Sequence, residues 1–255
     1  MSEQLPGIAG LASGIAVGLV VPSANPAVEP EMARLLPPAF RLHAARLPVM
    51  PGTTLEQRNQ RYPGLYQEAI AGFGGLKLAH IAIGLTGASY KLGVAGDRAL
   101  CDRLSGAAGT KVITASLALY EALTALGAKR IALVSPYPAW LTEAAAQYWT
   151  GAGFAVSQIV KASETFRAYE MAVDEVSRAL AQVDEAGADA VVLSGTGMMT
   201  LPSILARAGS SRVPCISSNM ACAWSFMRGS GAPERSVVLD LAAPALTAAQ
   251  ALASN

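Results

Sequence analysis

The sequence contains few of the residues on which most enzyme classes rely. Its 255 residues include only two histidines and three cysteines, and charged residues make up 15% of the chain. His43 and His80 have no Cys, His, Asp or Glu at a spacing typical of metal ligands, so we expect no metal site. The three cysteines show no close pairing, which favours a reducing compartment and argues against a disulfide framework.

An excess of charge is also absent. The 19 Lys and Arg residues nearly balance the 18 Asp and Glu residues, which gives a formal net charge of +1. Such a balance favours neither nucleic acid nor an anionic membrane surface as a partner. The longest apolar run, residues 7–21, is rich in glycine and is preceded by Glu3 rather than by basic residues. It lacks the marks of a signal peptide or membrane helix, and we expect a soluble cytoplasmic protein.

The common nucleotide and hydrolase motifs are missing as well. The chain has no Walker sequence, and it has no G-x-S-x-G turn of the kind that presents a nucleophilic serine. Residues 195–200 depart from the dinucleotide-binding fingerprint at its last glycine, and no acidic residue ends a following strand. We therefore expect no cofactor.

Short apolar runs, many rich in β-branched residues, alternate with longer stretches of helical periodicity. The predicted strands are Ile15–Val21, Phe40–Leu47, Ala79–Gly84, Lys111–Ile113, Arg130–Val134, Phe154–Val160, Ala190–Leu193 and Val213–Ile216. The predicted helices are Leu55–Phe73, Val94–Leu104, Leu117–Leu126, Leu141–Trp149, Phe166–Val183, Leu201–Ala208 and Met220–Met227. Continuous apolar strands separated by helices predict an α/β protein with parallel sheets covered on both faces.

The second half of the chain repeats the order of the first half. Residues 15–23 resemble 130–137, residues 79–87 resemble 188–197, and residues 110–116 resemble 211–218. In each pair a strand ends in a turn of small polar residues and a helix follows. The repeat predicts two pseudo-symmetric α/β lobes with a site in the cleft between them. We assign 1–118 with 230–255 to the first lobe and 119–229 to the second.

The carboxyl ends of these strands carry glycine and hydroxyl residues, and ligands bind at this edge of parallel sheets. The turns are 22–25, 86–90, 114–116, 135–137, 194–197 and 217–219. A helix follows each turn, so that backbone N–H groups and a positive dipole end point into the cleft. Such a cleft fits a carboxylate. The alternative is that each turn is an ordinary helix cap.

Two of these turns resemble those of known families. Residues 18–25, Gly-Leu-Val-Val-Pro-Ser-Ala-Asn, resemble the opening of maleate cis-trans isomerases. Residues 193–201, Leu-Ser-Gly-Thr-Gly-Met-Met-Thr-Leu, resemble the second-lobe turn of arylmalonate decarboxylases. Both families belong to the aspartate/glutamate racemase superfamily, and the resemblance covers residues 15–227. It implies two pseudo-symmetric lobes, a small carboxylate as substrate and chemistry without a cofactor.

The resemblance also implies a catalytic cysteine at each of the two symmetric turns, where this chain has Leu85 and Gly195. A racemase with two thiols, or an isomerase that forms a cysteine adduct, is therefore not expected. Protonation by a thiol, as the resemblance implies for decarboxylases, is in doubt for the same reason. Thr86 and Tyr137 match family residues that hold carboxylate oxygens.

We accordingly predict the following site. The catalytic candidates are Thr86, Tyr137, Thr196 and Lys91. The substrate-binding candidates are Pro22, Ser23, Asn25, Gly87, Ser89, Tyr90, Gly195, Gly197, Ser218 and Asn219. The proton donor or base is expected to be Tyr137, Tyr90, Lys91 or a water held by Ser23, Asn25, Thr196 or Asn219. For Lys91 the alternative is a surface position, and all three cysteines are expected to be structural, with Cys222 facing either the core or the cleft.

The leading hypothesis is a lyase, resembling a decarboxylase, or an isomerase that acts on a small carboxylate through an enolate-type intermediate. One alternative is a carboxylate-binding protein without catalysis. Another is a hydrolase that uses a positioned water or the hydroxyl of Thr196 or Ser194. The apolar segments Leu5–Gly14 and Leu241–Ala253 either cover the interface of a homo-oligomer or pack on their own lobe.

Overall fold

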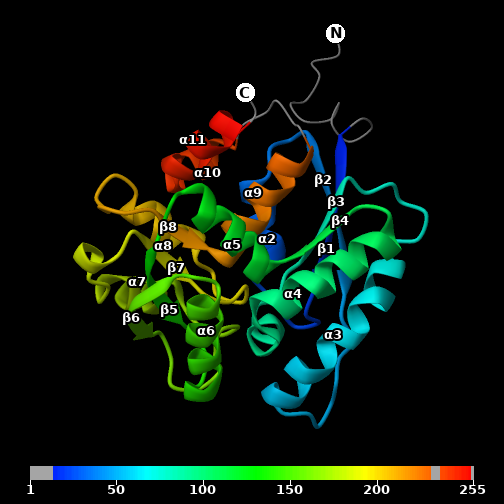
Figure 1. Ribbon diagram of the computed structural model, residues 1–255, viewed down its shortest axis with the longest axis horizontal. Coiled ribbons are helices and arrows are strands. Elements are labelled where there is room, and N and C mark those ends of the chain that lie inside the picture. Colours follow the sequence, from blue (N-terminus) through cyan, green and yellow to red (C-terminus); the bar gives the residue numbers. More distant parts are fainter. Residues whose placement is uncertain (1–13, 231–235, 254–255) are drawn as a thin grey trace.

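Two parallel sheets form the framework of the protein. The computed structural model describes residues 14–230 and 236–253 (Figure 1). The strands are β1 (Ile15–Val21), β2 (Phe40–Arg46), β3 (His80–Ile83), β4 (Lys111–Thr114), β5 (Arg130–Ser135), β6 (Ala155–Lys161), β7 (Ala190–Leu193) and β8 (Cys215–Ser217). They form sheets with the orders β2-β1-β3-β4 and β6-β5-β7-β8. The predicted α/β class with two similar parallel sheets is confirmed.

The two sheets have the same topology. β1 pairs in parallel with β2 and β3, and β5 pairs in parallel with β6 and β7. The central part of β1, Val17 to Val21, is buried, as are the interior residues of β5. Helices on both faces bury these strands, which is why their sequences are continuously apolar rather than alternating.

The helices follow the strands as the repeat predicts. They are α2 (Val28–Leu35), α3 (Leu55–Ala71), α4 (Gly87–Ala108), α5 (Ala115–Ala125), α6 (Ala139–Gly151), α7 (Val173–Ala181), α8 (Leu201–Arg207), α9 (Ser218–Ser230), α10 (Val237–Ala242) and α11 (Pro244–Ala253), with a 3-10 turn, η1, at Glu185–Gly187. Each of the six polar turns leads into a helix, as expected. Local caps explain several starts: Thr54 forms a capping box with Gln57, and Thr114 accepts a hydrogen bond from the N–H of Leu117.

Helices from both halves meet between the sheets. α4 packs on α6, α5 packs on α9, and α9 also contacts β3 and α2 of the first sheet. Figure 1 shows α2, α5 and α9 between the two lobes. Because α9 follows a strand of the second sheet and packs on the first, it joins the lobes. The division at 118/119 and 229/230 stays a proposal.

The end of the described chain packs on the molecule itself. α10 contacts α2 and α8, and α11 contacts α5. Leu246 of α11 is fully buried, whereas Leu241 of α10 is exposed. The apolar segment before Gly14 lies outside the described residues.

Several predicted boundaries were wrong. α2 was not predicted. α4 begins seven residues before its predicted start and contains a kink at Gly93, where φ is +65°. The helix predicted from Phe166 begins only at Val173, because the segment before it folds back to line a cavity described below. β6 and β8 each begin later than predicted, at Ala155 and Cys215.

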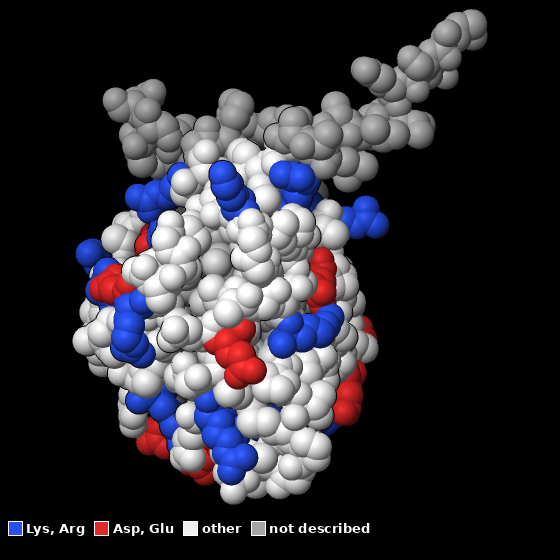
Figure 2. Space-filling model, turned by 90° about the vertical axis from the view of Figure 1, so that its right-hand side faces the viewer, with Lys and Arg blue, Asp and Glu red and all other residues white. Residues whose placement is uncertain are grey.

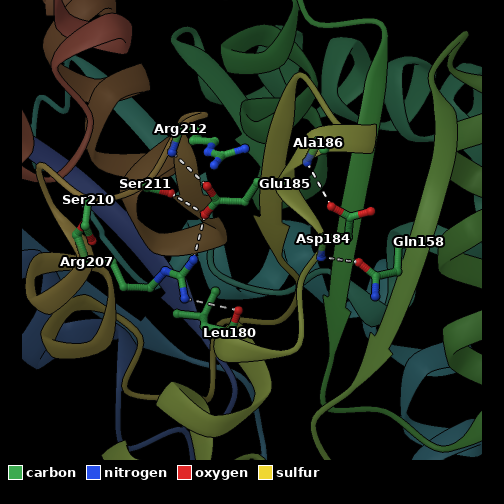
Figure 3. A network of polar contacts seen from close by, with 9 residues as sticks. All are labelled: Gln158, Leu180, Asp184, Glu185, Ala186, Arg207, Ser210, Ser211 and Arg212. Carbon is green, nitrogen blue, oxygen red and sulfur yellow. Dashed lines mark hydrogen bonds and ion pairs between the residues drawn. The ribbon is translucent and has the colours of Figure 1, made fainter.

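A polar network fixes the far end of the second lobe (Figure 3). The carboxylate of Glu185 in η1 accepts hydrogen bonds from the guanidinium of Arg207 at 2.6 Å, the hydroxyl of Ser211 at 2.6 Å and the N–H of Arg212 at 2.7 Å. These donors lower the pKa of Glu185 against the opposing effect of its burial, which is the largest single contribution. The network holds the α8–β8 connection against the start of β7.

Charges of both signs are dispersed over the surface. Figure 2 shows one face of the molecule, where Lys and Arg lie among Asp and Glu with uncharged surface between them. Within the described ranges, no helix is both long and apolar enough to cross a membrane.

Candidate functional site

A cavity of about 290 Å³ opens at the carboxyl ends of the strands. Its walls come from the turn after β1, the β2–α3 connection with the start of α3, the turns after β3 and β5, and the segment after β6. The lining residues are Pro22, Ser23, Ala24, Val49, Met50, Leu55, Arg58, Asn59, Tyr62, Leu85, Tyr137, Phe166 and Tyr169. A larger cavity of about 500 Å³ lies beside the amino ends of β3 and β4, next to Ile81 and Thr110. The smaller cavity is the better candidate, because ligands of parallel sheets bind at the carboxyl edge.

Two hydroxyl groups from opposite lobes meet in the wall of this cavity, where Tyr137 lines it and Thr86 is fully buried behind it. The Tyr137 hydroxyl lies 2.7 Å from the Thr86 hydroxyl, and both residues are buried. Burial raises the pKa of Tyr137, so its phenol stays protonated at neutral pH and can donate a hydrogen bond. The Tyr137 ring stacks on Phe166, which fixes its position in the wall. Thr86 precedes the first turn of α4, whose backbone N–H groups begin at Gly87.

The turn at Gly195 packs directly against Tyr137. Gly195 has φ +87°, and a Cβ atom at this position would lie 3.0 Å from the Tyr137 hydroxyl. The left-handed conformation and this contact both favour glycine. Leu85, at the equivalent turn of the first lobe, lines the cavity with its side chain. The two positions that the resemblance implies for cysteines therefore hold an apolar side chain and a residue without one.

Three predicted residues, Asn25, Thr196 and Asn219, lie behind the cavity wall and tie the lobes together. The Asn25 amide donates to the Thr196 hydroxyl at 3.0 Å, and that hydroxyl donates to the Gly84 carbonyl at 2.7 Å. The Asn219 amide donates to the Thr196 carbonyl at 3.2 Å and to the Glu31 carboxylate at 2.6 Å. These side chains are almost fully buried. None of the three lines the cavity, and their contacts hold the surrounding turns in position.

Other predicted residues also make internal contacts. The Tyr90 hydroxyl lies 2.5 Å from the Ser194 hydroxyl, and Ser218 donates to the Leu193 carbonyl. Ser89 donates to Asp97, which also accepts from Thr114 and Tyr148. Burial raises the pKa of Asp97 to about 6 although all three donors oppose it. Gly197 lies against Tyr169, since a Cβ there would lie 2.4 Å from the ring.

Lys91 does not line the cavity. Its ammonium group pairs with Glu56 and lies 5.1 Å from the centre of the Trp140 ring, with about a third of the side chain exposed. The predicted role in proton transfer requires a desolvated lysine that faces the cleft, and Lys91 is partly exposed and does not line the cavity. Its position is the surface position given as the alternative, and we assign it no proton transfer.

The cysteines are buried away from the cavity. Cys101, Cys215 and Cys222 are all buried, and burial raises the pKa of each thiol to about 12. Cys222 is fully buried and is not among the residues that line the cavity, so it faces the core. The thiols of the described chain are thus protonated and away from any ligand in this cavity.

Neither hydroxyl proposed as a hydrolytic nucleophile has a base beside it. The Thr196 hydroxyl donates to a backbone carbonyl, and the Ser194 hydroxyl contacts the hydroxyl of Tyr90. His80 is fully buried against Phe226, and burial lowers its pKa to about 3. Among the described residues, no three His, Cys, Asp or Glu side chains lie close enough to hold a metal ion.

Sequence reasoning missed one wall of the cavity. Arg58, Asn59 and Tyr62 lie on α3, and Phe166 and Tyr169 lie in the segment that was predicted to be helical. Asn59 is 4% exposed, and its amide nitrogen has no hydrogen-bond partner. Residues 57–61 are polar throughout, so no pattern in the sequence singles out Arg58 or Asn59 as part of the cavity wall.

Comparison with known proteins agrees with this geometry. A family model described as arylmalonate decarboxylase matches residues 17–239. The chain belongs to the arylmalonate decarboxylase family. A maleate isomerase from Nocardia farcinica is 29% identical over 231 residues, which cover 85% of this chain and 90% of that protein. A maleate isomerase from Geobacillus stearothermophilus is 28% identical and covers 76% and 83%.

Solved structures share the fold of this arylmalonate decarboxylase family member. The maleate isomerase Iso from Pseudomonas putida S16 has a TM-score of 0.82 and 24% identity, over 91% of this chain and 99% of that one. An unliganded arylmalonate decarboxylase has a TM-score of 0.71 and 22% identity, over 89% and 99%. The expected resemblance to the maleate isomerase and arylmalonate decarboxylase branch is confirmed.

Proposed function

We propose that the protein is a cofactor-independent lyase that decarboxylates a small malonate-type carboxylate through an enolate-type intermediate. The observation that carries the proposal is the buried Tyr137 hydroxyl, which lies in the wall of a cavity lined by no thiol and is held at 2.7 Å by the Thr86 hydroxyl behind it. The curated relatives are named maleate isomerases and the family model is a decarboxylase, which supports isomerase or lyase chemistry. Decarboxylation is preferred because it needs no covalent adduct with the protein.

The retained carboxylate would be held by donors that do not have to move. Tyr137 lines the cavity, and the Thr86 hydroxyl at the start of α4 fixes the position of its phenol from behind the wall. When the C–C bond to the departing carboxylate breaks, its electron pair moves onto the retained carboxylate as an enediolate. Fixed donors stabilise that charge as it develops, and one such donor contributes about 3–4 kcal/mol by mutational precedent.

The departing carboxylate would face the apolar part of the wall. Leu55 and Leu85 line the cavity, and Val49 of the β2–α3 connection is largely exposed beside it. An apolar environment disfavours the charged carboxylate relative to neutral CO₂. This difference favours cleavage of the C–C bond over recombination of CO₂ with the enediolate.

The carbon would then be protonated by a water. Of the four residues proposed to hold one, only Ser23 lines the cavity. A water there gives its proton to the enediolate carbon, and the hydroxide combines with CO₂ as bicarbonate. The balance is malonate-type dianion plus water to monocarboxylate plus bicarbonate, with no oxidant or metal required.

The proposal is tested by a thermal-shift screen of mono- and dicarboxylates, followed by NMR of each ligand in deuterated buffer. A malonate-type ligand that loses a carboxylate, or a monocarboxylate that exchanges deuterium next to its carboxylate, supports it. Ligands that bind tightly and stay intact without exchange would contradict it. That result would instead support a carboxylate-binding protein, the alternative favoured by the burial of all three cysteines.

The hydroxyl pair makes the first prediction. We expect Tyr137→Phe to lower kcat about 100-fold or more, because it removes a donor from the developing enediolate. Thr86→Val should lower kcat less, because it removes only the hydroxyl that positions Tyr137. Tyr120→Phe is the control, since Tyr120 lies on α5 and packs on Phe154 away from the cavity. Steady-state kinetics on the ligand identified by NMR makes the measurement. Equal rates for wild type and Tyr137→Phe would remove Tyr137 from the mechanism.

A further inference from the structure

One wall of the cavity has a charge that the decarboxylation step does not use. Arg58 is the only charged residue among the described residues that line the cavity. It lies near the start of α3, whose residues form the same cavity wall as the β2–α3 connection. An arginine in a half-buried cavity wall is a binding site for an anion unless a carboxylate of the protein neutralises it.

No carboxylate of the described chain neutralises Arg58. Its guanidinium donates a hydrogen bond from Nη1 to the Thr53 carbonyl at 2.8 Å. Among the described residues, Arg58 forms no ion pair. Its charge lies close enough to Tyr62 and Tyr169 to oppose the rise in pKa that burial causes in both phenols. The cation therefore lies among the aromatic rings of the cavity, with most of its donors available.

A neighbouring donor on the same wall also has no acceptor. Asn59 is 4% exposed, its amide nitrogen has no partner, and it lies against Gly87 at the start of α4. A buried donor without an acceptor costs free energy. Because this nitrogen is itself buried, Arg58 is the group on this wall that a ligand anion can reach.

We propose that Arg58 is the specificity-determining residue of this cavity, and that the substrate carries a third carboxylate, besides the departing and the retained one, that pairs with it. The inference rests on the proposed function, since it adds an acidic arm to the malonate-type substrate. The arm is retained through the reaction, because an arginine beside the departing carboxylate would stabilise its charge and oppose the loss of CO₂. An interaction that is the same before and during the reaction contributes binding rather than rate.

The experiment compares two probes of equal chain length, succinate and butyrate, by isothermal titration calorimetry at low ionic strength. We expect wild type to bind succinate at least about 10-fold more tightly, as one charge-assisted hydrogen-bonded pair requires. Arg58→Gln should bring the two dissociation constants within about two-fold of each other and leave that of butyrate unchanged. Arg58→Lys should keep part of the preference, because it keeps the charge.

Arg61→Gln is the matched control, since Arg61 is exposed on the same helix and does not line the cavity. It should keep the full preference for succinate. The inference is overturned if wild type binds both probes equally, if the preference survives Arg58→Gln, or if that variant weakens butyrate as much as succinate.

The outcomes separate this inference from the proposed function. A preference for succinate that depends on Arg58, together with no turnover or deuterium exchange of any carboxylate, supports the subsite and overturns the lyase. Exchange of monocarboxylates without a preference for succinate supports the lyase and overturns the subsite. Failure of wild type to bind either probe at millimolar concentration overturns both.

Discussion

A buried carboxyl group is costly to ionise, and Asp97 is such a group even though it accepts three hydrogen bonds that favour its ionised form. Its pKa is raised from 3.8 to about 6, with burial as the largest cause. The folded state therefore binds a proton more tightly than the unfolded state between these values, and stability falls as the pH rises from about 4 to about 6. The full difference corresponds to about 3 kcal/mol.

The prediction for Asp97 is a difference between two pH profiles. We expect Asp97→Asn to remove a loss of stability on the order of 3 kcal/mol between pH 4 and pH 6, measured by urea denaturation. His80 acts oppositely, because its pKa is lowered to about 3 and its stability contribution is lost as the pH falls below 6.5. That contribution is common to both proteins and cancels in the difference. Asp102→Asn, exposed on the same helix, controls for the loss of one negative charge. Parallel profiles for wild type and Asp97→Asn would contradict this account.

Gly195 lies where the resemblance implies a cysteine, and its backbone conformation explains why a side chain is disfavoured. We expect Gly195→Ala to destabilise the protein by more than Gly109→Ala, which is the control. Both glycines have positive φ, +87° and +65°, so both variants carry the backbone cost of about 1–2 kcal/mol. Only at Gly195 would the new Cβ crowd Tyr137, and only there should butyrate binding also weaken. Equal losses of stability in urea denaturation, with unchanged binding in both, would show that no crowding occurs.

At the scale of elements, the sequence predicts the strands better than the helices. Apolar β-branched runs such as Ile15–Val21 are buried on both faces, so their limits are visible in composition. α2 was missed because it is short, carries Pro30 in its first turn and has a pattern that depends on packing against α9. The prediction of a long helix from Phe166 was wrong because Phe166 and Tyr169, although at helical spacing, lie in a non-helical segment and line the cavity.

The residues of the site likewise fall into a group that the sequence predicts and a group that it does not. Pro22, Ser23 and Tyr137 were predicted because they end strands, and topology alone brings strand ends together. Arg58 and Asn59 lie inside α3, and only the packing of that helix against the first sheet brings them to the cavity. Tertiary contacts between a helix face and a turn leave no periodic signal in the sequence.

Residues 166–172, which precede α7 and were predicted to be helical, are the basis of a prediction at the scale of elements. We expect Gly197→Ala to move Tyr169 out of the cavity wall, because the new Cβ would lie 2.4 Å from the ring. Overpacking of this kind costs about 1–3 kcal/mol, and binding of butyrate should weaken with it. Gly106→Ala in α4 meets no atom within 4 Å, so it should be neutral or stabilising and leave binding unchanged. Thermal denaturation and calorimetry of both variants decide the matter, and unchanged binding in Gly197→Ala would show that Tyr169 moves without consequence.

The two lobes are held together by buried polar contacts as well as by helix packing. Glu31 of α2, in the half that carries the first sheet, accepts from the N–H of Leu201 at 2.6 Å and from Asn219 at 2.6 Å, and it also contacts Thr200. These partners belong to the half that carries the second sheet. Burial raises the pKa of Glu31, while every one of these donors opposes the rise. Since the cavity is walled by both halves, the fixed relation between them is a condition of the site.

Removing this contact should therefore loosen the whole molecule. We expect Glu31→Ala to cost about 3 kcal/mol or more in the free energy of unfolding, because it leaves several buried donors without an acceptor. Glu29→Ala on the same helix is the control: its ion pair with Arg46 is partly exposed and should cost less than about 1 kcal/mol. If Glu31→Ala does not fold, Glu31→Gln keeps the shape and should fall between the two. Butyrate affinity should fall in the Glu31 variants and not in Glu29→Ala, since only the former disturb Asn219 and, through it, the Thr196 turn. Equal stability of Glu31→Ala and Glu29→Ala would mean that helix packing alone sets the relation between the lobes.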